Sequence, residues 1–319
     1  LDMIVVVNSF NSWDQGVEPR KNKIGSSRDR EERGKKEGSR GRKLVRNIDA
    51  YQAFLKKAVE KYPFVKAWQI ENEPNSPRIW ADSPENYLTL LKMSYQAIKK
   101  ANPDAMVVIG GVSDPTAFNG PFWSKIFQEL MNPGGKDGYF DVFDAHWFLH
   151  ESNYTENFKQ LTDYIQDIRK KLNEVGYQDT PIWIGEMASY SGSPFIATRE
   201  GTIKRNKPYI SEKQHAGELV KLYIHTISLG VSKMFWVRLI EWNGYNKMYG
   251  YFDNTGLINN LLNDGESHKK LAYYSYKKLV EILKGVDIRT IEVLNLGKHA
   301  YAYKLIKNGH PIYFIWADL

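Results

Sequence analysis

The sequence predicts an α/β protein of parallel strand–helix units, arranged as a (β/α)8 (TIM) barrel with a short C-terminal β-sandwich segment. Three observations predict this fold. Strand-like apolar runs alternate with amphipathic helical patterns, and such units in series form either a closed barrel or an open doubly wound sheet. No glycine-rich nucleotide-binding pattern follows any strand, which counts against an open nucleotide-binding sheet. Two strands end in a glutamate, as catalytic strands of a barrel often do.

About six strand–helix units can be followed along the chain. Their strands are short apolar runs, and their helices repeat apolar residues every three to four positions. The predicted strands are Met3–Val7, Val65–Ile70, Ala105–Ile109, Phe140–Phe148, Pro181–Glu186 and Lys233–Leu239. The predicted helices cover Ile48–Lys61, Pro84–Ile98, Phe122–Met131, Thr155–Val175, Ser211–Leu229 and Ser267–Leu283. A (β/α)8 barrel needs eight units, so we infer that the first two are absent from this sequence.

Local signals support individual boundaries. Ser83 can cap a helix that begins at Pro84, because a first-turn proline lacks only an N–H that would be unpaired anyway. After Gly285 the pattern changes to short strands around turns such as Lys307-Asn308-Gly309. These strands are Ile291–Leu296, Ala300–Leu305 and Pro311–Trp316. We therefore expect a catalytic barrel domain over residues 1–285, incomplete at its N-terminus, and the start of an accessory antiparallel β domain over residues 286–319.

The composition is that of an ordinary globular protein, with 42% hydrophobic and 25% charged residues among 319. The 9 Trp, 20 Tyr and 14 Phe suit a cleft in which rings stack on sugars, although most must belong to the core. Cysteine is absent, which excludes disulfides and thiolate sites. No apolar run approaches the ~20 residues of a membrane span, and Leu1–Val7 lacks the order of a signal peptide. We expect no membrane partner.

The net charge of +7 is concentrated in one segment, Arg20–Arg46, which holds twelve basic against four acidic residues. The rest of the chain is therefore close to neutral, and we expect no nucleic-acid partner for the protein as a whole. The segment is also rich in glycine and serine, so its plain interpretation is a solvated loop. One alternative is that the segment attracts an acidic polysaccharide or a wall surface. Another is that the protein is an adhesion or nucleic-acid module, a hypothesis that this segment alone supports.

The stretch Trp68–Asn75 carries the first catalytic candidate. It begins as an apolar strand and ends in Glu71-Asn72-Glu73-Pro74, where the proline removes a backbone donor. Glu73 thus lies where the strand meets its loop, and Pro181–Glu186 repeats the design with Glu186 at its end. Two carboxylates at strand ends are the minimum for acid/base and nucleophilic work at a glycosidic bond. The structural alternative is that both cap a helix or pair with a surface arginine.

These motifs resemble those of clan A glycoside hydrolases, with families 5 and 39 the nearest in appearance. In that clan an Asn-Glu-Pro signature ends the fourth strand, which implies that Glu73 is the general acid/base and that Asn72 contacts the sugar 2-hydroxyl. The seventh strand of the clan carries the nucleophile in a pattern that Ile182–Glu186 matches, which implies Glu186 as the nucleophile. The resemblance spans roughly Met3 to Gly285. The tripeptide alone is weakly specific, but with a second strand-end glutamate in the right order it becomes strong.

Other stretches agree in order with the same clan. Val107–Gly111 resembles the fifth strand, and Phe140–His146 resembles the sixth, whose histidine lines the site. Phe235-Trp236 resembles the eighth, whose tryptophan, here Trp236, often forms the floor of the subsite where cleavage occurs. Residues on strand-end loops that could stack on sugars are Trp147, Trp242, Tyr190 and Tyr245.

Each of these assignments has a structural alternative. Asn72 could simply serve the turn before a proline, His146 could be a satisfied structural histidine, and Trp236 could belong to the barrel core. A zinc site at His146 and His150 is not expected, because His146 ends a strand and no Glu-x-x-His follows. No metal or cofactor is predicted.

The sequence departs from the clan at two points. Many members carry a tyrosine two residues after the sixth-strand histidine, hydrogen-bonded to the nucleophile, and this chain has Phe148 there. Tyr190 and Tyr245 are candidates to supply the missing hydroxyl. The arginine that usually lies early in the barrel near the nucleophile belongs to the part that is not found.

The sequence thus indicates a retaining β-glycoside hydrolase, cellulase- or xylosidase-like, that acts on an oligo- or polysaccharide by double displacement. Glu186 would attack the anomeric carbon while Glu73 donates a proton to the leaving oxygen, and Glu73 would then activate water. The competing hypothesis is a non-catalytic or truncated carbohydrate-binding barrel. Glu71 and Glu241 are expected to make structural hydrogen bonds.

Overall fold

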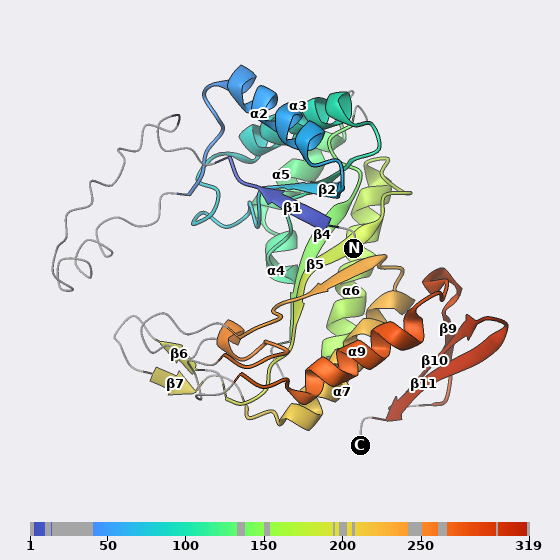
Figure 1. Ribbon diagram of the computed structural model, residues 1–319. Helices are drawn as coiled ribbons and strands as arrows, with labels where there is room; N and C mark the ends of the chain where they lie inside the picture. Colours follow the sequence, from blue (N-terminus) through green and yellow to red (C-terminus); the bar gives the residue numbers. More distant parts are fainter. Residues whose placement is uncertain are drawn as a thin grey trace. The chain divides into compact units, whose positions relative to one another are not determined.

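The computed structural model describes residues 3–9, 14, 41–132, 138–149, 154–193, 195–197, 203–205, 208–241, 251–260, 267–297 and 299–317 (Figure 1). Most of the basic segment Arg20–Arg46 lies outside these residues. The described part is an α/β protein with parallel sheets. It divides into unit 1, which comprises Leu1–His146 and Arg169–Ile182, and unit 2, which comprises Trp147–Ile168 and Trp183–Leu319.

Unit 1 is built on a parallel sheet of strand order β1-β2-β3. The strands are β1 (Met3–Val7), β2 (Val65–Ile70) and β3 (Met106–Ile109). Between β1 and β2, Val5 pairs with Trp68, and between β2 and β3, Trp68 pairs with Val107. All of β2 except Lys66 is buried, as expected for a parallel strand covered on both faces. The predicted bounds of β1 and β2 are confirmed, and β3 begins one residue later than predicted.

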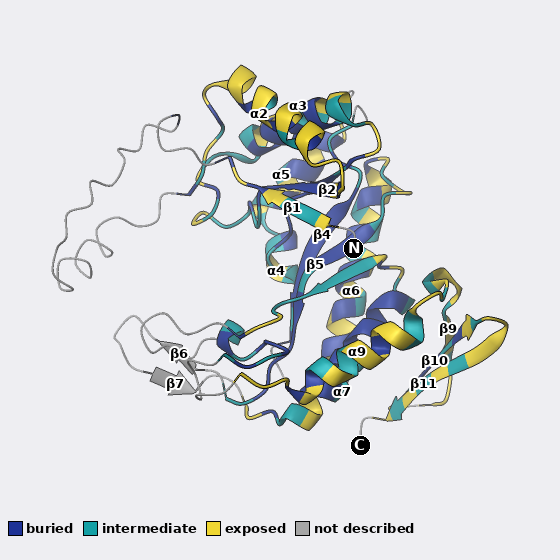
Figure 2. Ribbon diagram, viewed as in Figure 1, coloured by how far each residue is buried: buried dark blue, intermediate teal, exposed yellow. Residues whose placement is uncertain are grey.

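The described helices of unit 1 are α2 (Ile48–Lys61), α3 (Pro84–Ala101), the short α4 (Pro115–Phe118) and α5 (Pro121–Leu130). Three of these four described helices begin directly after a capping side chain, and α5 follows Gly120 without one. The Ser83 hydroxyl accepts a hydrogen bond from the Asn86 amide at 3.1 Å, and Pro84 follows as the first helical residue. α2 packs against α3, and both turn their exposed faces outward (Figure 2). The predicted start of α3 is thereby confirmed.

Aromatic side chains of unit 1 fill its interior. Phe143 lies at the centre of a cluster in which neighbouring ring centroids are 5.7 to 6.1 Å apart. The surrounding rings belong to Phe118, Trp123, Phe127 and Phe140, all at most 4% exposed. These rings therefore belong to the core, as predicted for most aromatic residues of the chain.

A second sheet has the strand order β4-β5-β8. β4 (Phe143–Phe148) begins in unit 1 and ends in unit 2, while β5 (Ile182–Ala188) and β8 (Lys233–Trp236) pair in parallel. The helices that follow in the chain are α6 (Tyr154–Glu174), α7 (Glu212–Ser228) and α9 (Leu271–Leu283). α7 starts with a capping box between Ser211 and Gln214.

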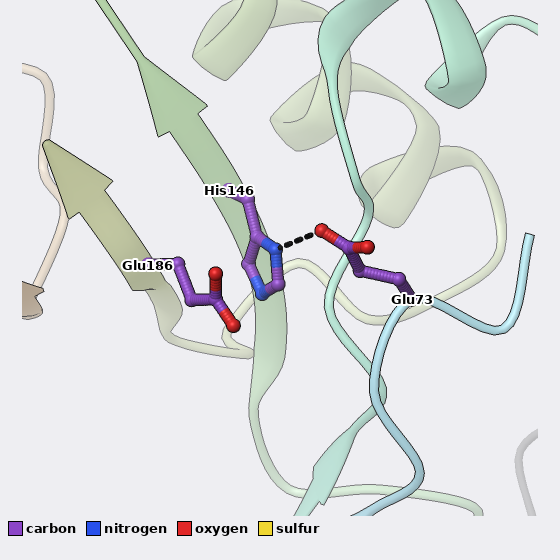
Figure 3. A group of neighbouring side chains, drawn as sticks. All are labelled: Glu73, His146 and Glu186. Carbon is purple, nitrogen blue, oxygen red and sulfur yellow. Dashed lines mark hydrogen bonds and ion pairs between the residues drawn. The ribbon is translucent and has the colours of Figure 1, made fainter. Parts of the chain in front are cut away.

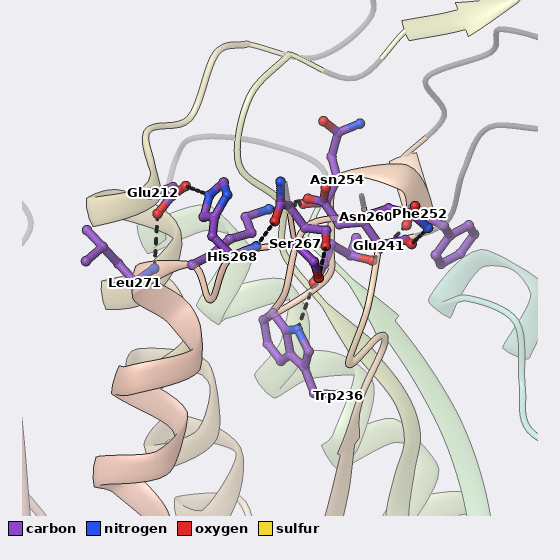
Figure 4. Close-up of polar contacts among 12 residues, drawn as sticks. Glu212, Trp236, Glu241, Phe252, Asn254, Asn260, Ser267, His268 and Leu271 are labelled. Carbon is purple, nitrogen blue, oxygen red and sulfur yellow. Dashed lines mark hydrogen bonds and ion pairs between the residues drawn. The ribbon is translucent and has the colours of Figure 1, made fainter. Parts of the chain in front are cut away.

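Four predicted elements are three or four residues shorter than expected. β4 begins at Phe143 instead of Phe140, and β8 stops at Trp236 instead of Leu239. β9 covers Glu292–Leu294 instead of Ile291–Leu296, and α9 begins at Leu271 instead of Ser267. The Asn259 backbone and side chain explain the late start, because the Ser267 hydroxyl donates to the Asn259 carbonyl at 3.3 Å and the His268 amide donates to Asn259 Oδ1 at 2.5 Å. Ser267 and His268 therefore precede the helix instead of forming its first turn (Figure 4).

The C-terminal strands form an antiparallel sheet of order β11-β10-β9, which confirms the predicted change of pattern. The strands are β9 (Glu292–Leu294), β10 (Ala300–Lys307) and β11 (His310–Ala317). Asn308 and Gly309 join β10 to β11 with φ of 51° and 78°, the left-handed pair that a tight hairpin needs. The assignment of residues 286–319 to a separate domain stays a prediction.

Smaller elements complete the described chain. They are the antiparallel pair β6 (Phe195–Ala197) and β7 (Ile203–Arg205) and the 3-10 turns η1 (Tyr251–Asp253) and η2 (Ile288–Thr290). Among the described residues, none of the helices combines the length and apolar character that a membrane span requires.

A buried histidine joins the C-terminal sheet to the helices of unit 2. His225 Nδ1 lies 2.8 Å from the Tyr303 hydroxyl, and Nε2 lies 3.0 Å from Thr162 Oγ1. The ring also stacks on Phe158 with centroids 4.6 Å apart. Burial lowers the pKa of His225 to about 4, and that of the fully buried His215 to about 3. Both histidines are therefore neutral in the folded protein at neutral pH.

This burial predicts a loss of stability in mild acid. Both folded-state pKa values lie below the 6.5 of an unperturbed histidine, so below that pH the unfolded chain binds more protons than the folded one. The free energy of unfolding should fall from about pH 6.5 towards pH 4, with His225 alone accounting for about 3 kcal/mol at the acid end. Urea denaturation at pH 7.5, 6 and 5 would measure it. His225→Phe should make the free energy of unfolding depend less on pH, whereas the control Tyr303→Phe should keep the dependence of the wild type. The same pH dependence in wild type and His225→Phe would contradict this prediction.

Candidate active site

After β2 the chain turns sharply through Glu71, Asn72 and Glu73. Glu71 and Glu73 have φ of 63° and 44°, a region that non-glycine residues occupy only where their surroundings hold them. The Gln69 amide helps to hold the turn by donating to the Glu71 carbonyl at 3.2 Å and to Asn72 Oδ1 at 3.3 Å. Because of this turn, the two glutamates do not share the face that a regular strand would give them, and they enter different surroundings.

Glu73 meets His146, which lies on β4 (Figure 3). Glu73 Oε1 is 2.9 Å from His146 Nδ1, and the glutamate side chain is 21% exposed while the histidine side chain is fully buried. On the other side of the ring, Nε2 lies 3.6 Å from Oδ2 of Asp144, two residues earlier on the same strand. A buried ring held in this way fixes the orientation of a carboxyl group that is still open to solvent.

Two glycines after β3 make room for this arrangement. A Cβ atom on Gly111 would lie 2.1 Å from His146 Nε2 and 2.8 Å from Asp144 Oδ2. A Cβ atom on Gly110 would lie 2.9 Å from Pro74 Cδ. Any larger residue at position 111 would therefore occupy the space of the histidine ring, so the Gly-Gly pair serves the site as well as ending the strand.

Polar side chains join the chain segments that follow β2 and β3. The Tyr87 hydroxyl donates to the Ile70 carbonyl at 3.1 Å and accepts from the Gly110 amide at 2.7 Å. The Asn75 side chain donates to Ser113 Oγ at 2.7 Å and accepts from Trp123 Nε1 at 3.1 Å. The loop that contains Glu73 is thereby fixed to the loop that follows β3.

Glu186 lies on β5, in unit 2, and is partly buried (Figure 3). The strand continues two residues beyond it to Ala188, so Glu186 does not end the strand as the sequence predicted. The register with β8 shifts between Ile184 and Met187, which places an irregularity at Gly185 and Glu186. Bulges of this kind re-aim side chains and are frequent beside active sites.

Trp236 ends β8 with a partly exposed side chain (Figure 4). Its indole nitrogen donates to the Thr255 carbonyl at 3.0 Å, and its ring lies 5.7 Å from that of His215 and 6.2 Å from that of Tyr223. These contacts fix the indole plane. Its role as a subsite floor stays a prediction.

Trp147 and Tyr190 are buried, contrary to the prediction that they lie on open strand-end loops. Trp147 lies inside β4, is 4% exposed and packs on Tyr164 with ring centroids 6.2 Å apart. Tyr190 is fully buried, donates its hydroxyl hydrogen to the Pro208 carbonyl at 3.1 Å, and burial raises its pKa to about 12. Neither ring offers a face to a sugar, and the Tyr190 hydroxyl is already used. Trp242 and Tyr245 lie outside the described residues.

Sequence reasoning missed Tyr251, which has no periodic pattern around it. Its hydroxyl lies 3.0 Å from the Leu149 carbonyl and 2.9 Å from the Ala188 carbonyl, at the ends of β4 and β5. Its ring packs edge-on against Phe148, the residue that stands where the clan usually has tyrosine. Burial raises the pKa of Tyr251 well above its usual value. Tyr251 therefore joins two strand ends as a neutral hydrogen-bond donor.

Glu241 makes structural contacts, as expected. It is buried and ion-paired with the buried Lys270, and its carbonyl accepts from the Asn260 amide at 2.9 Å. A Cβ atom on Gly256 would lie 2.4 Å from the Glu241 amide nitrogen, so the neighbouring chain passes very close. Figure 4 shows this network beside Trp236.

Comparison with known proteins adds a family match. The family model described as cellulase (glycosyl hydrolase family 5) matches residues 1–216, a region that includes Glu73, His146 and Glu186. A search of curated proteins found no match to the chain.

Solved structures resemble the chain at low sequence identity. A family 39 glycoside hydrolase from Bacteroides cellulosilyticus WH2 has 19% identity and a TM-score of 0.63, over 98% of this chain and 64% of that one. A glucosidase from Croceicoccus marinus has 14% identity and a TM-score of 0.59, over 84% and 55% of the two chains. A GH39 β-xylosidase from Caulobacter crescentus has 16% identity and a TM-score of 0.52, over 81% and 52%. The chain thus spans between about half and 64% of the length of these proteins, and the likeness concerns the fold.

Proposed function

Because the chain belongs to the cellulase family, glycosyl hydrolase family 5, we propose that it hydrolyses a β-linked saccharide by a retaining mechanism with Glu73 and Glu186. The observation that carries this proposal is the partly exposed Glu73 carboxyl group held by buried His146 where a parallel strand ends. The match over residues 1–216 supports it, because both glutamates fall inside the matched region. Cellulase- or xylosidase-like substrates are proposed from the family and from the β-xylosidase and glucosidase neighbours.

The proposed fold is a (β/α)8 barrel in which β2 and β5 take the places of the fourth and seventh strands. Both are parallel strands followed by helices, and each carries a glutamate at or near its C-terminal end. In a closed barrel such ends share one face. Retaining enzymes hold their two carboxyl groups about 5–5.5 Å apart, and this is the separation we propose for Glu73 and Glu186.

The reaction proceeds in two displacements. Glu186 attacks the anomeric carbon as the bond to the leaving oxygen breaks, and the proton of Glu73 moves to that oxygen. Water then attacks the glycosyl ester, Glu73 takes its proton, and Glu186 leaves as a carboxylate. His146 orients the Glu73 carboxyl group throughout, through the 2.9 Å contact at Nδ1. We propose that Asn72 contacts the sugar 2-hydroxyl and that Trp236 forms the floor of the cleaved subsite.

A substrate panel tests this function. The purified chain should hydrolyse at least one aryl β-glycoside or one of β-glucan, xylan and mannan, and Glu73→Gln should lower its activity by about 10²–10⁴-fold, the usual size of general acid/base catalysis. Glu60→Gln is the matched control, because Glu60 is exposed on α2 and should leave activity unchanged. If wild type and Glu73→Gln bind a saccharide but are equally inert, the non-catalytic carbohydrate-binding barrel is the better description.

A further inference from the structure

Glu71 makes an ion pair that the proposed reaction does not use. Its side chain is fully buried, and Oε2 accepts a hydrogen bond from Arg42 Nε at 2.5 Å. Oε1 accepts from the backbone N–H of Ser9 at 2.6 Å. Both carboxylate oxygens of Glu71, which lies two residues before Glu73, thus accept hydrogen bonds.

The backbone on both sides of this contact is fixed. The Arg42 amide donates to the Ile79 carbonyl at 2.6 Å, and the Arg42 carbonyl accepts from the Ala81 amide at 2.7 Å. A Cβ atom on Gly41 would lie 2.7 Å from the Pro77 carbonyl oxygen, so the segment lies tightly against the loop after Glu73. Arg42 therefore reaches Glu71 from an anchored position, although it belongs to the basic segment Arg20–Arg46.

The Arg42 side chain is 22% exposed and that of Glu71 is fully buried. Such an ion pair is weak evidence for stability, because desolvation of the charges offsets their attraction. A role in fixing geometry accounts for the pair better. Glu71 and Glu73 both occupy left-handed backbone conformations, which persist only where neighbouring groups determine them. The Glu71 carboxylate anchors the first residue of this turn to Ser9, at the end of β1, and to Arg42. Without that anchor, the turn can relax towards ordinary backbone angles and carry Glu73 away from His146.

We propose that Arg42 and Glu71 are positioning residues for the acid/base Glu73, and that they hold its carboxyl group in line with the leaving oxygen. This inference rests on the proposed function. It assigns a role to the C-terminal end of the basic segment, whose interpretation from sequence was a solvated loop. It also separates Glu71 from Glu73 in function: one carboxylate holds the turn, and the other transfers the proton.

Leaving-group dependence tests the proposal. Departure of 2,4-dinitrophenolate needs no proton, whereas departure of a phenolate is slow without one, so only the phenyl glycoside requires a well-placed acid. Arg42→Met keeps the length of the side chain and removes the guanidinium. We expect it to lower kcat/KM about 100-fold for the phenyl β-glycoside and less than about fivefold for the 2,4-dinitrophenyl β-glycoside of the same sugar. Arg46→Met, in the same segment and with the same loss of charge, is the matched control and should change neither.

Arg42→Lys provides a second measurement if Arg42→Met does not fold. The ammonium group keeps the charge but not the planar donor geometry, so the phenyl glycoside should lose an intermediate factor while the dinitrophenyl glycoside is unaffected. Equal losses on both glycosides in the folded variants, or no loss on either, would overturn the inference and leave the proposed function standing. A wild-type chain inert on both glycosides, and on the whole substrate panel, would overturn the proposed function and the inference with it.

Discussion

Replacing Glu186 with alanine is expected to lower hydrolysis of an aryl β-glycoside by about 10⁴–10⁶-fold, the scale on which removal of a nucleophile acts. Added azide is then expected to restore turnover and to yield the α-glycosyl azide. The reason is geometric: alanine leaves space for a small anion on the face from which Glu186 would attack. One displacement then replaces two and inverts the configuration. Release of the aryl group, and NMR of the sugar product, measure both results.

Two variants make this experiment decisive. Glu186→Gln fills the same volume, so azide should not rescue it. Glu73→Ala keeps the nucleophile, so azide should attack the glycosyl ester without needing a base and give the β-glycosyl azide. If azide instead rescues Glu73→Ala with inversion, the roles of the two glutamates are exchanged. If Glu186→Ala retains the wild-type rate, Glu186 is not the nucleophile.

Gly111→Ala is expected to damage both stability and activity, although it adds a single methyl group. The new Cβ atom would lie 2.1 Å from His146 Nε2, and the histidine side chain is fully buried, so the ring must move out of its place beside Glu73. Overpacking of this kind costs about 1–3 kcal/mol. We expect kcat/KM to fall about 100-fold, because Glu73, the proposed acid/base, loses its orientation. Urea denaturation and steady-state kinetics measure the two effects.

The chain provides matched controls for that substitution. Gly217 lies inside α7 with nothing within 4 Å of a Cβ atom, so Gly217→Ala should stabilise the protein by about 0.5–1 kcal/mol and leave activity unchanged. In the double variant Gly111→Ala/His146→Ala the clash is removed, so part of the stability should return without the activity. Wild-type stability and kinetics in Gly111→Ala would mean that the His146 ring does not occupy this space.

Local signals in the sequence predicted most of the secondary structure, but not the short strands β6 and β7 or the full bounds of β8 and α9. The helix α3 begins at Pro84, directly after Ser83, as predicted. The strand β2 covers Val65–Ile70, which are both of its predicted bounds. The C-terminal hairpin follows from the turn at Asn308-Gly309. Each depends on residues a few positions apart, through capping bonds, alternation or a tight turn, and such short-range physics can be seen in one stretch of chain.

The family was also visible in the sequence, because its catalytic motifs are short. Glu73 before Pro74, and Glu186 in a second apolar strand, sufficed for the resemblance to clan A glycoside hydrolases that the family match over residues 1–216 confirms. The pairing of the two glutamates in one mechanism stays a proposal.

Only the tertiary structure decided which polar groups meet. His146 is 73 residues from Glu73, Arg42 is 29 residues from Glu71, and Tyr251 is 102 residues from Leu149. No local pattern reports such contacts, because they depend on how strands and loops remote in sequence pack together. For the same reason the burial of Trp147 and the space that Gly111 leaves for a histidine ring could not be predicted from their neighbours in the chain. The sequence by itself determined most of the elements and the motifs of the family, and packing decided which side chains hold them in place.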